Sequence, residues 1–576
     1  MGNRQHQLEE FGTEPAVAPG LPPPIARPHP PPLPGVWGTE GGFVRHPLLA
    51  EGEVRALPYQ LDLARVGLAE DLLVVLPTGM GKTAIAAMLA AERLRAGSGK
   101  VLFLAPTRPL VDQHSDSFRR WIPGMRRARF TGTVRSATRE GSWEAADVVF
   151  ATPQIIVHDL AEGLYTLGEV DLLIFDEAHR AVGKYSYVDV ARFYREQRPA
   201  EGRVLALTAS PGAQIERIES VIATLGTRRV ESRSRTDEGV REFVQPVQLE
   251  ERRVRLPPIS QAIQARLVEA THREGVKLQR MGYLRKKPLR SLSVKDLIAL
   301  RAEIFARPGP MVRRFGPLYH QLILLHLHHL SERLETQGLG PFLSYLERLE
   351  GKPKPGKGDR AVLALPEVVQ SREEARRFLT DTSESSHPKL DLLSQIVEEE
   401  LARTHSSPVR ILVFAQYRDT IQDIQEALER RGHKVGRFVG QASRARSDRG
   451  MNQREQHQVL SAFREGRFPV MVASSVGEEG IDVPDVDLVV FFEAVPSEIR
   501  AIQRRGRTGR TRYGRVVLLL TEETRDLGYQ RAEARRELEM NRVIRRLSVR
   551  GRQRREAAPP KPEPPAEEGA ASPTHI

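Results

Sequence analysis

The 576-residue chain contains no cysteine. Without thiols it can form neither disulfides nor thiolate metal sites, and this composition agrees with a reducing compartment. We therefore expect a cytoplasmic protein without structural disulfides.

Long apolar runs are missing as well. No segment offers the roughly 18 consecutive apolar residues that a membrane-spanning helix needs, so we expect no membrane partner. The first residues, MGNRQHQLEE, hold no apolar signal-peptide core, and His6 stands where a myristoylation motif takes Ser or Thr. We expect neither a secretory leader nor a myristoyl anchor.

Positive charge, in contrast, is in excess. The chain has 87 Lys and Arg residues against 74 Asp and Glu residues, a formal net charge of +13. Such an excess favours a polyanionic partner, most simply nucleic acid. A generally arginine-rich proteome gives the same balance, so charge alone leaves both explanations open. The length is sufficient for about three or four domains.

Both ends of the chain lack a core-forming pattern. Residues 1–45 include PPPIARPHPPPLPG and are interpreted as a disordered or flexible arm, with docking to a proline-binding partner as the alternative. Residues 542–555 form a basic helical stretch, which either contacts a phosphate backbone or is a solvated helix face. We expect residues 557–576 to be disordered, so that 546–576 is a basic and then disordered tail.

Residues 72–84, LLVVLPTGMGKTA, carry the clearest chemistry. Their apolar start predicts a buried strand, and residues 84–95 predict a helix. Glycines between a strand and a helix turn backbone N–H groups towards phosphates, beside the partial positive charge of the helix N-terminus. Lys82 would reach the β- and γ-phosphates, and the Thr83 hydroxyl would bind Mg²⁺. A chance turn is the alternative, because Leu76 replaces the first glycine of the GxxxxGK[ST] pattern.

From residue 101 onward apolar strands alternate with helical segments, which predicts an open parallel α/β sheet with ligands at the carboxyl ends of its strands. Strands are expected in VLFLAP (101–106), DVVFATP (147–153), DLLIFDEAH (171–179) and RVLALTASPG (203–212). Asp176 is placed to hold Mg²⁺, Glu177 to orient and deprotonate the attacking water, and His179 to couple the site to its surroundings.

Residues 213–385 change character, because long charged amphipathic stretches replace the strand-like runs. Residues 317–349 predict two packed helices. This region also holds four closely spaced histidines that do not share one helix face and have no cysteine beside them. We interpret them as core and rim residues rather than metal ligands: His320, His326, His328 and His329.

Strand–helix alternation resumes near His387 and predicts a second α/β sheet up to about residue 530. Its strands are expected within 410–417, 433–440, 469–475, 487–493 and 514–520. This part ends in QRRGRTGR (503–510), with four arginines in eight residues. These arginines either form a solvated basic surface or bring a guanidinium to the γ-phosphate from a facing domain, which would stabilise the transition-state charge by on the order of 10³-fold or more.

With these blocks assembled, the chain resembles superfamily 2 helicases, and more narrowly the helicase module of the archaeal Hef and Fanconi anemia group M family. The resemblance covers roughly residues 46–545. The strings that carry it are IFDEAHRAVGKYSYV (174–188), LTASPG (207–212), LHLHHLSERLETQGL (325–339), RFVGQAS (437–443), SDRGMNQREQ (447–456) and SSVGEEGIDVPDVDLVVFFEAVPSEIRAIQRRGRTGR (474–510).

The resemblance implies an α/β fold class, with two RecA-like parallel-sheet domains and an all-α insert between them. The helicase ATP-binding domain would span residues 46–225, the thumb-like helical insert 226–385 and the helicase C-terminal domain 386–545. ATP and Mg²⁺ are the implied cofactors, in a cleft between the two sheets.

The resemblance also assigns roles to single residues. The implied nucleotide contacts are Gln60, Pro77, Thr78, Gly79, Met80, Gly81, Lys82, Thr83, Gly480 and Asp482, with Gln60 reading adenine. The implied catalytic residues are Lys82, Asp176, Glu177, Gln503, Arg507 and Arg510, and the metal ligands are Thr83 and Asp176. Coupling of hydrolysis to movement falls to His179, Thr208 and Ser210. The implied nucleic-acid contacts are Thr107, Arg108, Thr131, Gly132, Thr152, Pro153, Gln154, Tyr417 and Arg418.

Two departures from the family pattern matter. Leu57 stands three positions before Gln60, where family members carry arginine, so adenine selectivity does not carry over directly. The ERKxxxD nuclease signature of archaeal Hef does not occur, so we do not expect this chain to cleave DNA.

The resulting hypothesis is an ATP-dependent DNA helicase or translocase acting on forks and four-way junctions in repair or replication restart, moving 3′ to 5′. We expect nucleoid association, DNA contacts mainly to the backbone, and a separate nuclease or sliding clamp as a protein partner. The alternatives are an RNA-directed superfamily 2 ATPase and a DNA-binding scaffold with a vestigial ATP site.

Overall fold

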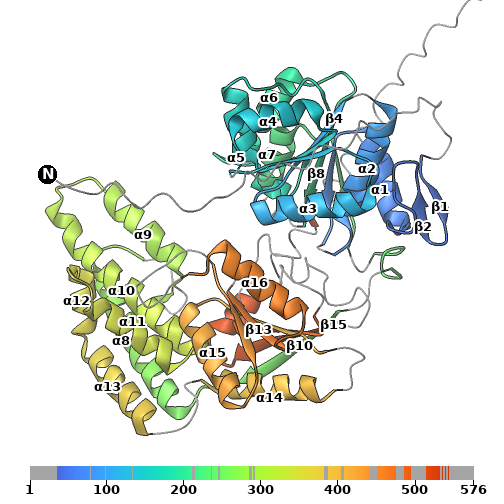
Figure 1. The fold of residues 1–576 in the computed structure, drawn as a ribbon. Coiled ribbons are helices and arrows are strands. Elements are labelled where there is room, and N and C mark those ends of the chain that lie inside the picture. The colour runs from blue at the N-terminus through green and yellow to red at the C-terminus, as the bar shows by residue number, and fades with distance from the viewer. Residues whose placement is uncertain are drawn as a thin grey trace, which may run out of the picture.

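The computed structural model describes the chain between residues 36 and 546, with internal gaps of which the longest are 441–449, 475–485 and 494–513. Within these described residues the chain forms two large parallel β-sheets and a helical unit (Figure 1). None of the described helices is both long and apolar enough to cross a bilayer.

The first sheet has the strand order β5-β6-β4-β7-β8-β3-β9, and all of its described strand pairs are parallel. Its strands are short and almost wholly buried, as expected where helices cover both faces. They are β3 (Leu72–Val75), β4 (Lys100–Leu104), β5 (Arg127–Phe130), β6 (Val148–Ala151), β7 (Val170–Phe175), β8 (Arg203–Thr208) and β9 (Arg229–Ser232).

Alternate residues of the central strands belong to two separate apolar cores, whereas the edge strands β5 and β9 contribute to one of them. Leu72 and Val74 pack with the helices on one face, whereas Leu73 and Val75 pack with those on the other. The first face is covered by α1 (Pro58–Ala69), α2 (Lys82–Ala96) and α3 (Arg108–Trp121). The second is covered by α4 (Ser136–Ala145), α5 (Pro153–Ala161), α6 (Tyr187–Gln197) and α7 (Ile215–Leu225).

The second sheet has the order β10-β15-β14-β11-β13-β12 and is also parallel throughout its described pairs. The five strands expected after residue 387 are confirmed. They are β11 (Ile411–Ala415), β12 (Val435–Phe438), β13 (Val470–Ser474), β14 (Leu488–Phe491) and β15 (Gly514–Thr521), accompanied by α14 (Pro388–Ala402), α15 (Arg418–Arg430) and α16 (Gln453–Arg464).

The helical insert stands beside the second sheet (Figure 1). The two packed helices predicted within 317–349 are confirmed as α10 (Val312–Thr336) and α11 (Leu339–Glu350). Leucines of α10 are central to both apolar clusters of the insert. The remaining helices of this unit are α8 (Pro258–Arg280), α9 (Val294–Ala306), α12 (Lys357–Leu363) and α13 (Pro366–Asp381).

The structure differs from the sequence-based expectation at the edges of these units. Residues 36–45, expected in the disordered arm, form the hairpin β1 (Gly38–Glu40) and β2 (Phe43–Arg45), and Trp37 and Val44 are buried in the first core. Residues expected in the helical insert form β9 and β10 (Val247–Val254). The β10 strand pairs with β15 although the whole insert separates them in sequence. Its sequence, VQLEERRV, is charged, because it lies at the sheet edge.

The second domain contains a buried cluster of charged residues. Lys389, fully buried, donates to Asp526 at 2.6 Å and to the Phe492 carbonyl at 2.9 Å. Glu493 lies beside it and accepts from the Gln416 N–H at 3.0 Å. Burial raises the pKa of Glu493 to about 8, an effect that the nearby ammonium of Lys389 only partly opposes.

This raised pKa predicts a pH-dependent stability. Between the ordinary value of 4.5 and about 8, the folded Glu493 keeps a proton that the unfolded chain releases. The free energy of unfolding must therefore fall as the pH rises through this window, by up to about 1.4 kcal/mol per pH unit. Glu493→Gln cannot titrate, so its stability relative to the wild type should increase from pH 5.5 to pH 8.

Urea denaturation followed by circular dichroism at both pH values measures this difference. Glu196→Gln, at an exposed position of α6, is the matched control and should follow the wild type at each pH. A stability difference between Glu493→Gln and the wild type that is the same at pH 5.5 and pH 8 contradicts the prediction.

Candidate active site

The loop between β3 and α2 is shaped by glycine. Gly79 has φ of 83° and Gly81 has φ of 80°, left-handed values that glycine adopts without a steric penalty. Gly81 is the N-cap residue of α2, so the partial positive charge of the helix N-terminus lies at this loop. Such a terminus favours an anion.

Lys82 and Thr83 occupy the first turn of α2, which begins two residues before the helix predicted over residues 84–95. The Lys82 ammonium donates to the Leu76 carbonyl at 3.1 Å, and the Leu76 N–H donates to the Thr208 carbonyl at 3.0 Å. The loop is therefore tied both to its own lysine and to the neighbouring strand. Backbone N–H groups, an ammonium and a hydroxyl together form a donor set that fits phosphate.

Helix α1 holds the other side of this loop. The Tyr59 hydroxyl and the Gln60 amide each donate to the Met80 carbonyl at 3.0 Å. A Cβ atom at Gly81 would lie 2.1 Å from Nε2 of Gln60, so the loop and Gln60 are in close contact. The predicted nucleotide residues Gln60, Pro77, Gly79, Met80, Gly81, Lys82 and Thr83 therefore belong to one local unit.

Asp176 and Glu177 follow β7, two strands from β3 in the sheet. The Asp176 N–H donates to the Leu104 carbonyl at 2.9 Å, and the Tyr187 hydroxyl donates to the Asp176 carbonyl at 2.6 Å. Burial keeps the pKa of Tyr187 well above its ordinary value, so this hydroxyl stays a donor. Glu177 has φ of 49°, a left-handed value that is costly for a residue with a side chain and occurs mostly at functional sites.

His179 connects these carboxylates to the next strand. Its Nδ1 lies 3.3 Å from Oε2 of Glu177 and 3.1 Å from Oγ1 of Thr208, which is fully buried at the end of β8. The structure therefore brings together three residues that the sequence assigned to water activation and coupling. Asp176 and Thr83 offer a carboxylate and a hydroxyl, hard oxygen donors that fit Mg²⁺.

The predicted nucleic-acid residues of the first domain follow three adjacent strands, β4, β6 and β5, in the connecting loops or at the first residues of the next helices. Each loop leaves the carboxyl end of its strand, and the Thr152 N–H donates to the Phe130 carbonyl of the neighbouring strand at 3.2 Å. Arg108, Gly132 and Gln154 are exposed, whereas Thr131 and Pro153 are buried and support the loops. Thr107 is the N-cap residue of α3.

In the second domain, Tyr417 and Arg418 lie after β11. Arg418 donates to the Gly440 carbonyl at 3.0 Å. The Arg333 guanidinium of α10 lies over the Tyr417 ring, 4.8 Å from its centroid, so the helical insert contacts this predicted nucleic-acid residue directly.

Several predicted residues lie outside the described part of the chain. They are Thr78 and Ser210 in the first domain and Gly480, Asp482, Gln503, Arg507 and Arg510 in the second. Their predicted roles stay predictions.

Two residues at the site were not identified from the sequence. One is Tyr187, which bonds Asp176 as described above. The other is His114, whose Nε2 lies 2.9 Å from Oδ2 of Asp176. The available signal for His114 was its place on the apolar face of a predicted helix, beside Val111 and Phe118, where a polar ring needs a buried partner.

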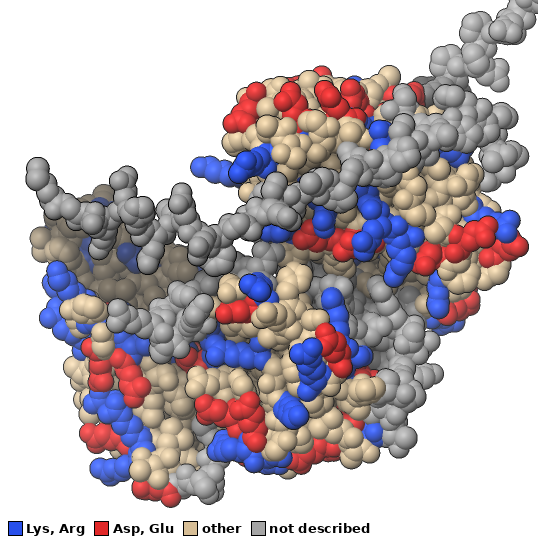
Figure 2. All heavy atoms as spheres, viewed as in Figure 1, with Lys and Arg blue, Asp and Glu red and all other residues tan. Residues whose placement is uncertain are grey.

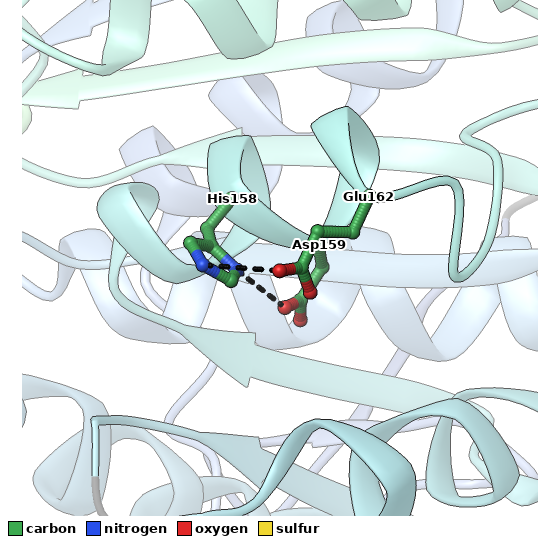
Figure 3. A group of neighbouring side chains, drawn as sticks. All are labelled: His158, Asp159 and Glu162. Atoms are coloured by element: carbon green, nitrogen blue, oxygen red, sulfur yellow. Dashed lines mark ion pairs between the residues drawn. The ribbon is translucent and has the colours of Figure 1, made fainter.

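A separate cluster of His158, Asp159 and Glu162 on α5 has the residue types of a metal site (Figure 3). His158 lies 3.4 Å from Glu162 and 3.7 Å from Asp159. Asp159 is fully buried and accepts from the Arg139 guanidinium at 2.7 Å and from the Tyr165 hydroxyl at 2.8 Å. The Asp159 carboxylate already accepts hydrogen bonds from these donors. We therefore interpret the cluster as a structural hydrogen-bond network rather than a metal site.

The histidines of the insert likewise have protein partners. Nδ1 of His320 lies 2.7 Å from Glu274, and Nδ1 of His326 lies 2.8 Å from the Tyr345 hydroxyl. On the visible surface of the first domain, acidic side chains line the upper rim, whereas Lys and Arg side chains are mixed with acidic ones along the lower edge (Figure 2). On α3 itself, Arg108 lies 3.8 Å from Asp112 and Arg119 lies 3.5 Å from Asp116.

Comparison with known proteins agrees with this geometry. The family described as DEAD/DEAH box helicase matches residues 57–218, and the family described as helicase conserved C-terminal domain matches residues 388–512. A solved structure, the Hef helicase domain of Pyrococcus furiosus, is 39% identical with a TM-score of 0.64. That match covers 83% of this chain and 97% of the Hef chain.

Three curated relatives are similar over most of this chain. A Methanocaldococcus jannaschii protein whose name describes an ATP-dependent RNA helicase is 34% identical over 88% of this chain and 63% of its own length. The ATP-dependent DNA helicase MPH1 of Pyricularia oryzae is 33% identical over 82% of this chain and 44% of its own length. The Fanconi anemia group M protein homolog of Mus musculus is 32% identical over 83% of this chain and 25% of its own length.

This chain therefore spans only part of the length of these curated relatives. One assignment follows from its two helicase-family regions, its two parallel sheets and a match that covers nearly all of the Hef helicase domain. The chain belongs to the Hef and Fanconi anemia group M family of superfamily 2 helicases.

Proposed function

We propose that this chain is an ATP-driven DNA helicase or translocase that acts on forks and four-way junctions in repair or replication restart and moves 3′ to 5′. The observation that carries the proposal is a shared edge of the first sheet. Three features follow the carboxyl ends of its strands: the glycine loop before α2, the carboxylates Asp176 and Glu177, and the predicted DNA contacts. Relatives named DNA helicases support DNA as the substrate.

The proposed chemistry uses the groups of this edge. Lys82 and the N–H groups at the start of α2 bind the β- and γ-phosphates of ATP, while Glu177 orients water and accepts its proton. Mg²⁺, when bound by Thr83 and Asp176, would neutralise charge on the phosphates. His179 contacts both Glu177 and Thr208, so it links the protonation of Glu177 to Thr208.

The second domain completes the proposed site. We infer that Gly480 and Asp482 contact the nucleotide and that Gln503, Arg507 and Arg510 close over the γ-phosphate. ATP would draw the two domains together and hydrolysis would release them, so that alternating grip on the sugar–phosphate backbone produces a step. Contacts to phosphates imply little sequence preference and strong salt dependence.

A second candidate is an RNA-directed motor, because two of the relatives are named RNA helicases. The nucleic acid that stimulates ATP hydrolysis discriminates between the two candidates, as described below.

Two substitutions test the ATPase assignment. Lys82→Ala removes the ammonium beside the loop, and Glu177→Gln removes the base, so each should lower the DNA-stimulated turnover by on the order of 10²-fold or more. Steady-state ATP hydrolysis measures this, with the exposed Lys184→Ala and Glu196→Gln as charge-matched controls. A vestigial ATP site is indicated if the wild type binds ATP without turnover.

Gly81→Ala tests the shape of the loop. The new methyl group would need a left-handed backbone costing roughly 1–2 kcal/mol and would meet Gln60 at 2.1 Å. We expect binding of a fluorescent ATP analogue to weaken at least about tenfold, since that penalty corresponds to about one decade or more in affinity. Gly141→Ala on α4, where a Cβ meets nothing within 4 Å, is the control and should bind like the wild type.

Substrate and direction are tested with labelled nucleic acids of defined shape. We expect ATP-dependent unwinding of forks and four-way junctions, little unwinding of blunt duplex DNA, and displacement of a block from the 5′ end rather than the 3′ end of a single strand. Duplex RNA that stimulates ATP hydrolysis more than fork DNA would overturn the DNA assignment and favour the RNA-directed motor.

A further inference from the structure

His114 is the one buried histidine of the first domain that contacts a predicted metal ligand among the described residues. Its Nε2 lies 2.9 Å from Oδ2 of Asp176, and both side chains are almost completely buried. Because a carboxylate oxygen only accepts, the ring must carry a proton on Nε2 and donate it. With Oδ2 engaged in this way, Oδ1 is the oxygen left for a ligand.

The ring of His114 is held in place by aromatic packing. It packs on Phe103 of β4 with ring centroids 4.5 Å apart, and Phe103 in turn packs on Phe118 of α3 at 5.7 Å. Val111, His114 and Phe118 recur on one face of α3, which is therefore fixed to the sheet along its length. A shift of α3 must move the His114 ring with it.

The predicted DNA-contact loop lies between two bonds to Asp176. Before the loop, the Leu104 carbonyl at the end of β4 accepts from the Asp176 N–H at 2.9 Å. After the loop, His114 on α3 bonds the Asp176 carboxylate. Thr107 and Arg108 lie between these two anchors, at the N-cap and first residue of α3. Whatever the loop contacts is thus connected to Asp176 from both sides.

We propose that His114 is a positioning residue that fixes the Asp176 carboxylate and transmits DNA binding at Thr107 and Arg108 to it through α3. A phosphate of the DNA backbone bound at the start of α3 holds this helix in place and, through the His114 bond, also the Asp176 carboxylate. Binding of DNA thereby increases the affinity of the site for Mg²⁺ with nucleotide. This inference rests on the proposed function, because it takes Asp176 as a metal ligand and the loop as a DNA contact.

The test compares His114→Gln, His114→Leu and Ser115→Ala in the full chain. Glutamine places an N–H donor near the position of Nε2, whereas leucine keeps the bulk and removes the donor. Ser115 is the next residue on α3, equally buried, and serves as the control for packing. The readout is the Mg²⁺ concentration that gives half-maximal binding of a fluorescent ATP analogue, with and without fork DNA.

Fork DNA should lower this Mg²⁺ concentration for the wild type, for Ser115→Ala and, in part, for His114→Gln. His114→Leu should need roughly ten- to a hundredfold more Mg²⁺, the loss expected for one hydrogen bond to a charged group, and should no longer respond to DNA. Its affinity for fork DNA in the absence of nucleotide and Mg²⁺, measured by fluorescence anisotropy, should stay within about twofold of the wild type, because the donor touches no DNA-contact residue.

A responsive wild type with an equally responsive His114→Leu overturns the inference and leaves the proposed function standing. The inference also fails if Ser115→Ala and His114→Gln are as defective as His114→Leu, since packing alone then explains the effect. If fork DNA does not change ATP binding by the wild type although forks are still unwound, the proposed coupling between DNA and Mg²⁺ binding is wrong. If the wild type neither binds ATP nor unwinds forks, the proposed function falls with it.

Discussion

Parallel pairing of β4, β7, β8 and β3 is the constraint on which the candidate site depends. These four strands are neighbours in the sheet, so the segments that follow them leave from the same edge. The Leu76 N–H bonds Thr208, and the Asp176 N–H bonds Leu104, so the ladder continues into the functional loops themselves. The strand pairing therefore fixes the distances between these loops. A reactive site needs such preorganisation.

The same edge brings together the predicted catalytic residues and the predicted DNA contacts of the first domain. His179 contacts both Glu177 and Thr208, and His114 contacts Asp176 from the helix that starts at the predicted DNA-contact loop. In the second domain the insert contributes as well, because Arg333 of α10 lies over Tyr417 and the Arg525 N–H donates to Glu335 of α10 at 3.0 Å. The helical insert is thus attached to the domain whose predicted DNA residue it contacts.

The sequence predicted most of the strands, but not all. Strands such as Leu72–Val75 and Ile411–Ala415 are runs of apolar residues, the pattern of a strand covered on both faces. The strands β5, β9 and β10 were missed because they are short or charged, with sequences RARF, RVES and VQLEERRV. Each lies at or near a sheet edge, where fewer neighbours bury the side chains.

What the sequence determined by itself is local chemistry and class. Two local patterns predict the α/β fold and the groups proposed to bind a nucleotide. One is a strand followed by a glycine loop, Lys82, Thr83 and a helix, and the other is the pair of carboxylates after the strand that ends before Asp176. Only the tertiary structure decided which distant segments complete them. The bond from His114 to Asp176, the pairing of β10 with β15 and the contact of Arg333 with Tyr417 join residues far apart in the chain. No local pattern encodes such contacts, because they arise from the way the sheets order their strands and the helices bury their apolar faces.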